Sequence, residues 1–198
     1  MASIVVAGDT SGTVTLTAPA VAGTTTLTLP TTSGTVLTSA STIPTSQLSG
    51  SISSSSLPTG SVLQVVSATT TSTTTTTSSS YVDTNLSASI TPSSSSNKIL
   101  VMVTGGVQVN DLGNVYGDAF VNITRGATEI TASRIAINFG STAWTDYISS
   151  VPLSYLDSPS TTSSTTYKVR VSTSNSQIIY LGGGGGSAGT ITLMEIKG

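Results

Sequence analysis

Few side chains in this sequence could carry catalytic chemistry. The 198 residues include no histidine and no cysteine, so the commonest general base and the thiol nucleophile are both missing. Two carboxylates are the minimum for glycoside hydrolysis, and Asp111 with Asp118 could in principle form such a pair. Both flank turn-forming residues, Gly113-Asn114 and Gly117, which predicts loop positions rather than a catalytic pair. We therefore predict that the protein is not an enzyme.

Two glycine-containing stretches share features with ligand-binding loops. Residues 110–114 offer oxygen ligands beside Gly113, but they lack the spacing and the terminal glutamate of a calcium loop. Residues 182–186 are consecutive glycines, and no lysine follows them as in a phosphate-binding loop. We expect these glycines to connect two strands; the alternative is close packing of three chains on an axis, which glycine permits. The sequence predicts no metal and no cofactor.

Trp144, Tyr147 and Tyr155 are the candidates for ligand recognition. An exposed aromatic ring can stack on a sugar while its polar tip stays hydrated. The alternative is packing in the sandwich core or in a subunit interface, where aromatic residues are enriched. We favour packing and keep binding of a host surface glycan as the alternative.

The charge balance argues against two classes of partner. Six lysines and arginines and eight aspartates and glutamates give a net charge of −2, too few cations to neutralise a phosphate backbone. We therefore expect no nucleic-acid binding. No apolar run approaches the ~18 residues of a membrane-spanning helix, and the N-terminus lacks the basic start of a signal peptide. These features predict synthesis in the cytoplasm without membrane insertion.

Short apolar runs separated by Ser, Thr, Gly and Asn predict an all-β fold. Residues 167–171 alternate most clearly and place Tyr167, Val169 and Val171 toward a core. Residues 98–103 are apolar on both faces, which predicts a central strand. Low complexity predicts surface loops at 69–80, 158–166 and 182–186. The other runs are 61–66, 81–90, 119–123, 129–139, 143–155 with a break at Pro152, 177–181 and 190–196. Roughly nine strands at this spacing predict a β-sandwich of the jelly-roll type.

An 11-residue repeat follows a short strand at Ile4-Val5-Val6. Glycines recur at 12, 23 and 34, with prolines at 19 and 30 in the same phase, so each unit reads as a strand between turns. Two apolar residues per unit cannot offset an ordering cost of roughly 1 kcal/mol or more per residue. The repeat must therefore be ordered by partners. The expected anchoring and assembly residues are Val14, Leu16, Leu27, Leu29 and Val36.

These signals divide the chain into three parts. Residues 1–45 are an extended β arm for anchoring and trimerisation, 46–60 a Ser/Pro-rich linker, and 61–198 the β-sandwich. A closed homotrimer would let the strand edges of the arm pair rather than stay open.

A family resemblance rests on residues 60–66, 81–86, 90–93 and 95–101, together with the Gly-Thr-Val-Thr-Leu motif of the arm at 12–16. These stretches resemble a domain of tailed-bacteriophage virion proteins and the N-terminal spacers of phage fibre-type proteins. The resemblance covers the arm and roughly the first half of the sandwich. It implies a structural virion protein, commonly trimeric, used as a fibre, spike or capsid decoration, and it assigns no functional residue.

These inferences predict a capsid decoration (cement) protein or short head fibre on the particle surface. Its partners would be its own copies and another virion protein, such as the major capsid protein or a tail component. The alternative is a tail-fibre receptor- or carbohydrate-binding module, which needs an exposed aromatic cluster around Trp144. A depolymerase would need convergent carboxylates in a groove.

Overall fold

The computed structural model describes residues 3–7, 10–17, 21, 24, 31, 52–110, 116–138, 146–174, 178–181 and 188–198. The chain divides into two compact units, Met1–Gly50 and Ser51–Gly198, which we call the arm unit and the sandwich unit. The limits proposed from the sequence for the arm, linker and sandwich stay predictions. No helix among the described residues is long and apolar enough to cross a membrane.

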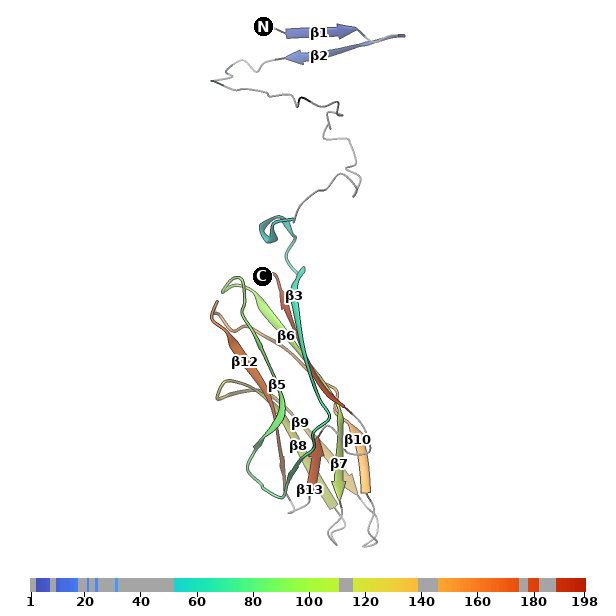
Figure 1. The fold of residues 1–198 in the computed structure, drawn as a ribbon, viewed down its shortest axis with the longest axis vertical. Coiled ribbons are helices and arrows are strands. Elements are labelled where there is room, and N and C mark those ends of the chain that lie inside the picture. The colour runs from blue at the N-terminus through green and yellow to red at the C-terminus, as the bar shows by residue number, and fades with distance from the viewer. Residues whose placement is uncertain are drawn as a thin grey trace. The chain divides into compact units, whose positions relative to one another are not determined.

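The described residues of the arm unit form a two-stranded antiparallel ribbon, the arm hairpin (Figure 1). It pairs β1 (Ser3–Ala7) with β2 (Thr13–Thr17), which confirms the predicted first strand and the strand of the first repeat. Gly12 has a φ of 81°, a left-handed conformation that glycine adopts without strain, and β2 starts directly after it. The later predicted anchors Leu27, Leu29 and Val36 lie outside the described residues.

The sandwich unit is built from antiparallel strands, preceded by a single turn of 3-10 helix at Ser54–Ser56. The strands are β3 (Val62–Thr70), β4 (Thr74–Thr76), β5 (Val82–Ile90), β6 (Lys98–Thr104), β7 (Gly106–Asn110), β8 (Tyr116–Arg125), β9 (Thr128–Asn138), β10 (Asp146–Ser150), β11 (Leu153–Asp157), β12 (Thr165–Thr173), β13 (Ile178–Leu181) and β14 (Gly189–Ile196).

Three four-stranded sheets have the orders β11-β6-β14-β3, β10-β7-β13-β4 and β5-β12-β8-β9. The first two sheets have their strands in the same order, if strands that follow each other in the chain are matched. The matched pairs are β10 with β11, β6 with β7, β13 with β14, and β3 with β4. Gly105 separates β6 from β7, and Val151-Pro152 separate β10 from β11 at the break predicted from Pro152. These two sheets therefore act as one interrupted layer, and β5-β12-β8-β9 forms the other.

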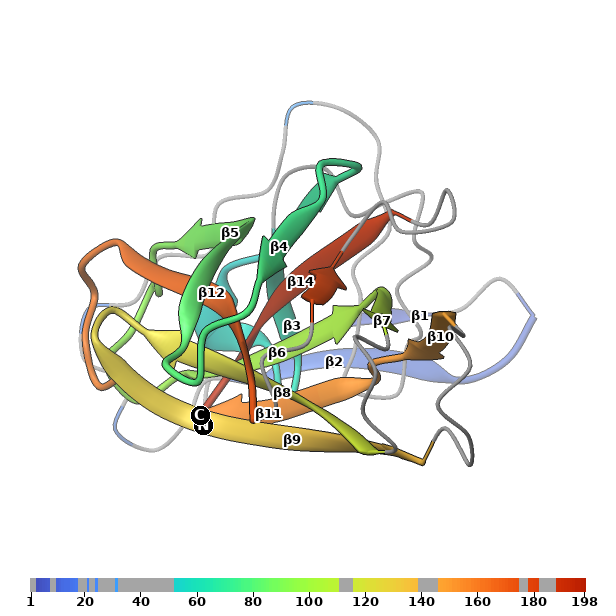
Figure 2. The ribbon, with the colours of Figure 1, turned by 90° about the horizontal axis from the view of Figure 1, so that it is seen from below.

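Counting each interrupted pair as one strand gives eight strands in chain order: β3/β4, β5, β6/β7, β8, β9, β10/β11, β12 and β13/β14. The layer orders then become 1-8-3-6 and 2-7-4-5, which is the strand order of a jelly roll. Every pairing in both layers is antiparallel. Figure 2 shows neighbouring strands such as β8 and β9 running side by side. The predicted all-β fold with a jelly-roll-like sandwich is confirmed.

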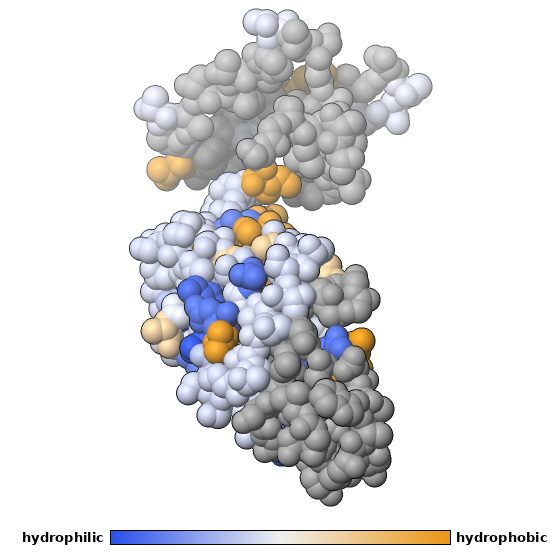
Figure 3. Space-filling view, turned by 60° about the horizontal axis from the view of Figure 1, so that its bottom comes forward, coloured by the Kyte–Doolittle hydropathy of each residue, from blue (hydrophilic) through white to orange (hydrophobic). Residues whose placement is uncertain are grey.

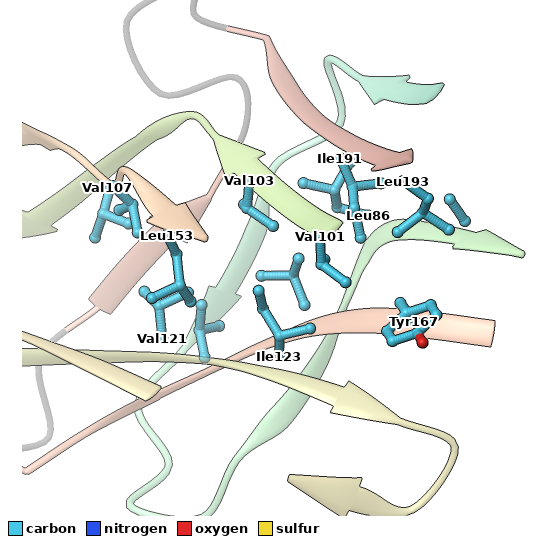
Figure 4. Close-up of a cluster of buried hydrophobic side chains, with 14 of the residues drawn as sticks. Leu86, Val101, Val103, Val107, Val121, Ile123, Leu153, Tyr167, Ile191 and Leu193 are labelled. Carbon is cyan, nitrogen blue, oxygen red and sulfur yellow. The ribbon is translucent and has the colours of Figure 1, made fainter. Parts of the chain in front are cut away.

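The core lies between the two layers (Figure 4). Tyr167, Val169 and Val171 on β12 are fully buried, as their alternation predicted. Strand β6 is central, as predicted, and its inward residues are also buried. Burial of each such aliphatic side chain contributes ~1.5–3 kcal/mol. The core residues labelled in Figure 4 are Leu86, Val101, Val103, Val107, Val121, Ile123, Leu153, Tyr167, Ile191 and Leu193.

The prediction of a surface loop over 69–80 is wrong in part. Strand β3 extends to Thr70, and β4 pairs with β13 inside this Thr/Ser run. Threonine is β-branched and favours the extended backbone, so low complexity here did not imply a loop. Strand β7 was not predicted either, because the turn-forming residues 110–114 that follow it favoured a loop in this part of the chain. The glycines 182–186 lie outside the described residues. Of the predicted loop 158–166, residues 158–164 form no strand, whereas Thr165 and Thr166 already belong to β12.

Candidate assembly interface

The described structure does not gather the predicted aromatics into a binding site. Tyr155 lies on the edge strand β11 opposite Val101, and its surface is 40% exposed. Tyr147 lies on β10 opposite Val109, but its side chain is outside the described residues, as is all of Trp144. The aromatic cluster therefore stays a prediction.

Asp118 lies within strand β8, so the predicted loop position is wrong, and its side chain forms an ion pair on the surface. Its carboxylate accepts hydrogen bonds from Arg134 Nε at 3.0 Å and Nη2 at 2.9 Å, and from Ser174 Oγ at 3.0 Å. The hydrogen bond from Arg134 is the main reason why the pKa of Asp118 lies below its ordinary value. A general acid for glycoside hydrolysis needs a raised pKa, so Asp118 is poorly suited to that role. Its proposed partner Asp111 lies outside the described residues.

Replacing Asp118 by asparagine should change the molecule little. The Arg134 side chain is 59% exposed, and exposed ion pairs contribute weakly to stability. We expect the thermal midpoint to fall by less than about 3 °C in calorimetry. Arg134→Gln is the matched change on the other partner and should behave alike. A much larger loss would mean that the pair is buried in an assembly.

The outer face of β5-β12-β8-β9 is charged. Asp83 accepts a hydrogen bond from Lys168 Nζ at 3.0 Å, and Arg170 Nε lies 2.8 Å from its other oxygen, though not in hydrogen-bonding alignment. The bond from Lys168 is the main reason why the pKa of Asp83 is lowered. Arg170 also donates to the Tyr81 carbonyl oxygen at 2.7 Å and lies over its ring at 5.9 Å.

Polar side chains fill the layer beneath these charges. Asn122 and Thr124 on the central strand β8 are 1% and 2% exposed. Asn122 donates from Nδ2 to Glu129 Oε2 at 2.5 Å, whereas its Oδ1 has no partner among the described residues. No group of three or more potential His, Cys, Asp or Glu metal ligands occurs in the described part of the chain. With Asp118 and Arg134, this face has the character of a solvated surface held by ion pairs.

The outer face of β11-β6-β14-β3 has the opposite chemistry. Ladder register places Leu156 opposite Leu100, Leu100 opposite Met194 and Met194 opposite Val65, so one apolar row crosses all four strands. Leu156 and Val65 at its ends are 47% and 55% exposed, and the two inner residues are half-buried. We call these four residues the apolar row. The next row, from Ser154 through Met102 and Thr192 to Ser67, carries hydroxyls around a methionine.

Charge is almost absent from this second face. Residues of β6 and β14 that alternate with the buried ones point outward, and Lys98 is the one charged residue among them in the described strands. Figure 3 shows a surface whose coloured part is mostly pale, with small orange apolar and deep blue charged groups between. The two outer faces therefore suit different environments, solvent for the charged one and a partner for the apolar one.

Two buried polar networks went unnoticed in the sequence. Glu195 is 1% exposed and accepts hydrogen bonds from Asn97 Nδ2 at 2.6 Å, Gln64 Nε2 at 2.6 Å, and Ser93 N and Oγ at 2.6 and 2.8 Å. Burial raises the pKa of Glu195, but the bonds from Asn97, Gln64 and Ser93 outweigh burial and lower it overall. The sequence could have predicted the burial of Glu195, because Ile191, Leu193 and Glu195 stand at every second position of the strand and so face the core together.

The second network joins β8, β11 and β12. Asp157 is 6% exposed and accepts from Arg125 Nη1 at 2.9 and 2.8 Å and from Tyr167 Oη at 2.7 Å. Burial and the bond to Asp157 raise the pKa of Tyr167 far above its ordinary value. The network therefore fastens edge strand β11 across the core to the facing sheet.

The start of the sandwich unit is tied to the end of β14. Lys197 donates from Nζ to the carbonyl oxygens of Ser55, at 3.1 Å, and Leu57. Its backbone exchanges 2.9 Å hydrogen bonds with Gly60 and Ser61. Residues 55–61 are thus held in place beside β14, where β3 begins.

No protein-family model matches the chain, and no curated protein matches its sequence. Among solved structures, the infectious bursal disease virus VP2 subviral particle is similar with a TM-score of 0.37 and 15% identity, over 66% of this chain and 32% of that one. The Gx strain of the same virus gives a TM-score of 0.37 and 17% identity, over 68% and 34%. The match thus spans about a third of the length of those viral chains. Similarity at this level implies nothing about what the chain binds.

Proposed function

We propose that the protein is a structural component of a virus particle, a capsid decoration protein or short head fibre displayed on the particle surface after synthesis in the host cytoplasm. One observation carries the proposal: a hairpin whose two strands are uncharged and expose apolar residues precedes a sandwich with a complete core of its own. Ile4, Val5 and Val6 are 66%, 57% and 57% exposed. An isolated two-stranded ribbon is marginally stable in water, so this hairpin needs a partner that the sandwich does not.

The arm would attach the protein to other chains. We propose a homotrimer whose arms contact one another and a neighbouring virion protein, such as the major capsid protein or a tail component. Val14 and Leu16, two of the predicted anchors, stand opposite Val6 and Ile4 in the hairpin ladder. The register therefore puts four apolar positions on one face of the hairpin, where they can dock together.

Fold alone does not decide the function. Jelly rolls occur in viral capsids, lectins and cupins, and one fold hosts many activities. The resemblance of residues 60–101 to tailed-phage virion proteins supports the first of these classes. Binding of the sandwich to a glycan array would instead favour a receptor-binding module.

Deleting residues 1–45 tests the proposal. We expect the full chain to scatter light as three copies of 19.8 kDa and the truncated chain as one copy with unchanged β-sheet circular dichroism. The truncated protein should also fail to join particles, because it lacks the arm. Incorporation at the level of the full chain would contradict an anchoring role for the arm.

A further inference from the structure

Exposed strand edges in the sandwich unit are protected unequally. A charged residue at an edge discourages pairing with another chain. Four edge strands carry such residues: β5 has Asp83, β9 has Glu129 and Arg134, β10 begins with Asp146, and β11 ends in Asp157 after Pro152.

Strand β3 is the exception. Its nine residues include no charge and no proline, and its continuation β4 consists of three threonines. Within the described residues β3 forms a ladder on one side only, with β14. Val62 and Val65 on this strand are 51% and 55% exposed. A long, uncharged, partly apolar edge of this kind is a site for strand addition.

The arm hairpin has matching properties. Both of its strands are uncharged, and β1 forms a ladder on one side only, with β2, in the described part of the chain. The one charged residue in the first 80 is Asp9. Ile4 and Val6 alternate with Val5 along β1, so they share the face that also holds positions 14 and 16.

We propose that the arm hairpin of one copy adds to the β3 edge of a second copy, with β1 alongside β3, so that β11-β6-β14-β3 gains two strands. The apolar face of the hairpin then extends the apolar row beyond Val65. No charge is buried in this junction, since neither edge carries one. Main-chain hydrogen bonds provide affinity, and the row provides the apolar contact.

Chain length lets the arm reach a neighbour. The 34 residues from 18 to 51 separate β2 from the described start of the sandwich unit, and 34 extended residues span up to roughly 110 Å. A head-to-tail contact of this type closes into a ring when three copies complete the rotation. The proposal rests on the trimer put forward above and identifies where its arm binds.

The absence of cysteine makes a direct test clean. Copies carrying Val6→Cys would be co-expressed with copies carrying Val65→Cys, Ser67→Cys or Thr69→Cys, the outward positions of β3, and then oxidised. Adjacent strands bring Cα atoms to about 4.5–5.5 Å, within disulfide range. The Val6→Cys copies would carry a tag of different size, and we expect, for at least one β3 position, a band on a non-reducing gel that contains one chain of each variant. Because each copy has a single cysteine, a Val6–β3 link can only join different copies.

Matched controls use the charged edge. Ser87→Cys and Ser89→Cys place exposed cysteines on β5 and should give no band that contains one chain of each variant when combined with Val6→Cys. Equal linking at β3 and β5, or none at any β3 position, would overturn the proposal. If each arm instead docked on the β3 edge of its own copy, no disulfide would join the two variants, and this result would also contradict the proposal.

A second pair of variants tests the edge without cross-linking. Val65→Lys adds a charge at an outward position of the β3 edge, and Ser89→Lys adds one at an outward, exposed position of the β5 edge. We expect Val65→Lys to scatter light as a single chain and Ser89→Lys to stay trimeric, with the same circular dichroism in both. Trimeric Val65→Lys would overturn the proposal. Particle incorporation is scored separately: a mixed link without incorporation defeats the virion role alone, and incorporation without a link defeats the strand addition alone.

Discussion

Replacing Glu195 by alanine is expected to lower the free energy of unfolding by about 3–5 kcal/mol. The change removes the acceptor for four hydrogen bonds in a site that is 1% exposed. Asn97, which is 3% exposed, then keeps one bond from Nδ2, to Ser93 Oγ at 3.1 Å, and Gln64 keeps one bond, to the Thr91 carbonyl oxygen. Urea unfolding at a fixed protein concentration measures the loss as a lower midpoint with an unchanged slope.

Glu195→Gln is the matched control, because it keeps the shape and one acceptor oxygen. We expect a loss of about 1–2 kcal/mol, since an amide group now faces the Gln64 amide. A loss as large as that of the alanine variant would show that charge, not acceptor geometry, holds the network together.

The same pair of proteins gives a pH signature. The pKa of Glu195 is lower in the folded protein than its ordinary value of about 4.5, so its ionisation stabilises the fold above that pH. This contribution disappears as the pH falls through the folded-state pKa. The stability difference between the natural protein and Glu195→Gln should therefore shrink on acidification from pH ~5 to ~3. A constant difference across that range would contradict the assignment.

Replacing Asp157 by alanine should have the second large effect, also about 3–5 kcal/mol. Asp157 is the partner of both Arg125 and the hydroxyl of Tyr167, and Tyr167 is fully buried. Without the carboxylate, that hydroxyl is buried with no acceptor, and edge strand β11 loses its tie to β8 and β12. Thermal and urea unfolding both measure the change.

Tyr167→Phe separates the two parts of this network. It removes the hydroxyl and keeps the ring in the core, so a loss of only about 1 kcal/mol is expected. Combining it with Asp157→Ala should cost less than the sum of the single changes, because no unpaired hydroxyl is left. Additive losses would mean that Tyr167 and Asp157 act independently.

Sequence patterns were most informative for the burial of single side chains, which depends on their position within one strand. Alternation placed Tyr167, Val169 and Val171 in the core, because the pleat imposes a period of two. The same rule would have found Glu195, had its charge not suggested an exposed position. The Thr-rich stretch of β4 was missed because low complexity resembles a loop, although threonine favours strands.

Pairings between distant residues were out of reach. Asp118 with Arg134 and Asp157 with Arg125 depend on which strands become neighbours, and strand order is not encoded in any local pattern. The apolar row is likewise a property of four strands together, since each contributes one ordinary residue. The sequence was sufficient to predict the jelly-roll fold class, whereas the candidate interface could be identified only from the register between neighbouring strands.

The ladder between β3 and β14 also sets the timing of folding. It joins Gln64 to Glu195, residues 131 apart in sequence, and it pairs the first strand of the sandwich with its last. On the ribosome, β3 therefore waits unpaired until β14 has emerged, with Val62 and Val65 accessible throughout. Such long-range closure makes folding slow and leaves β3 open to wrong partners in the meantime. Expression at low temperature or with chaperones should raise the yield of soluble protein, and loss of β14 should send the chain into aggregates.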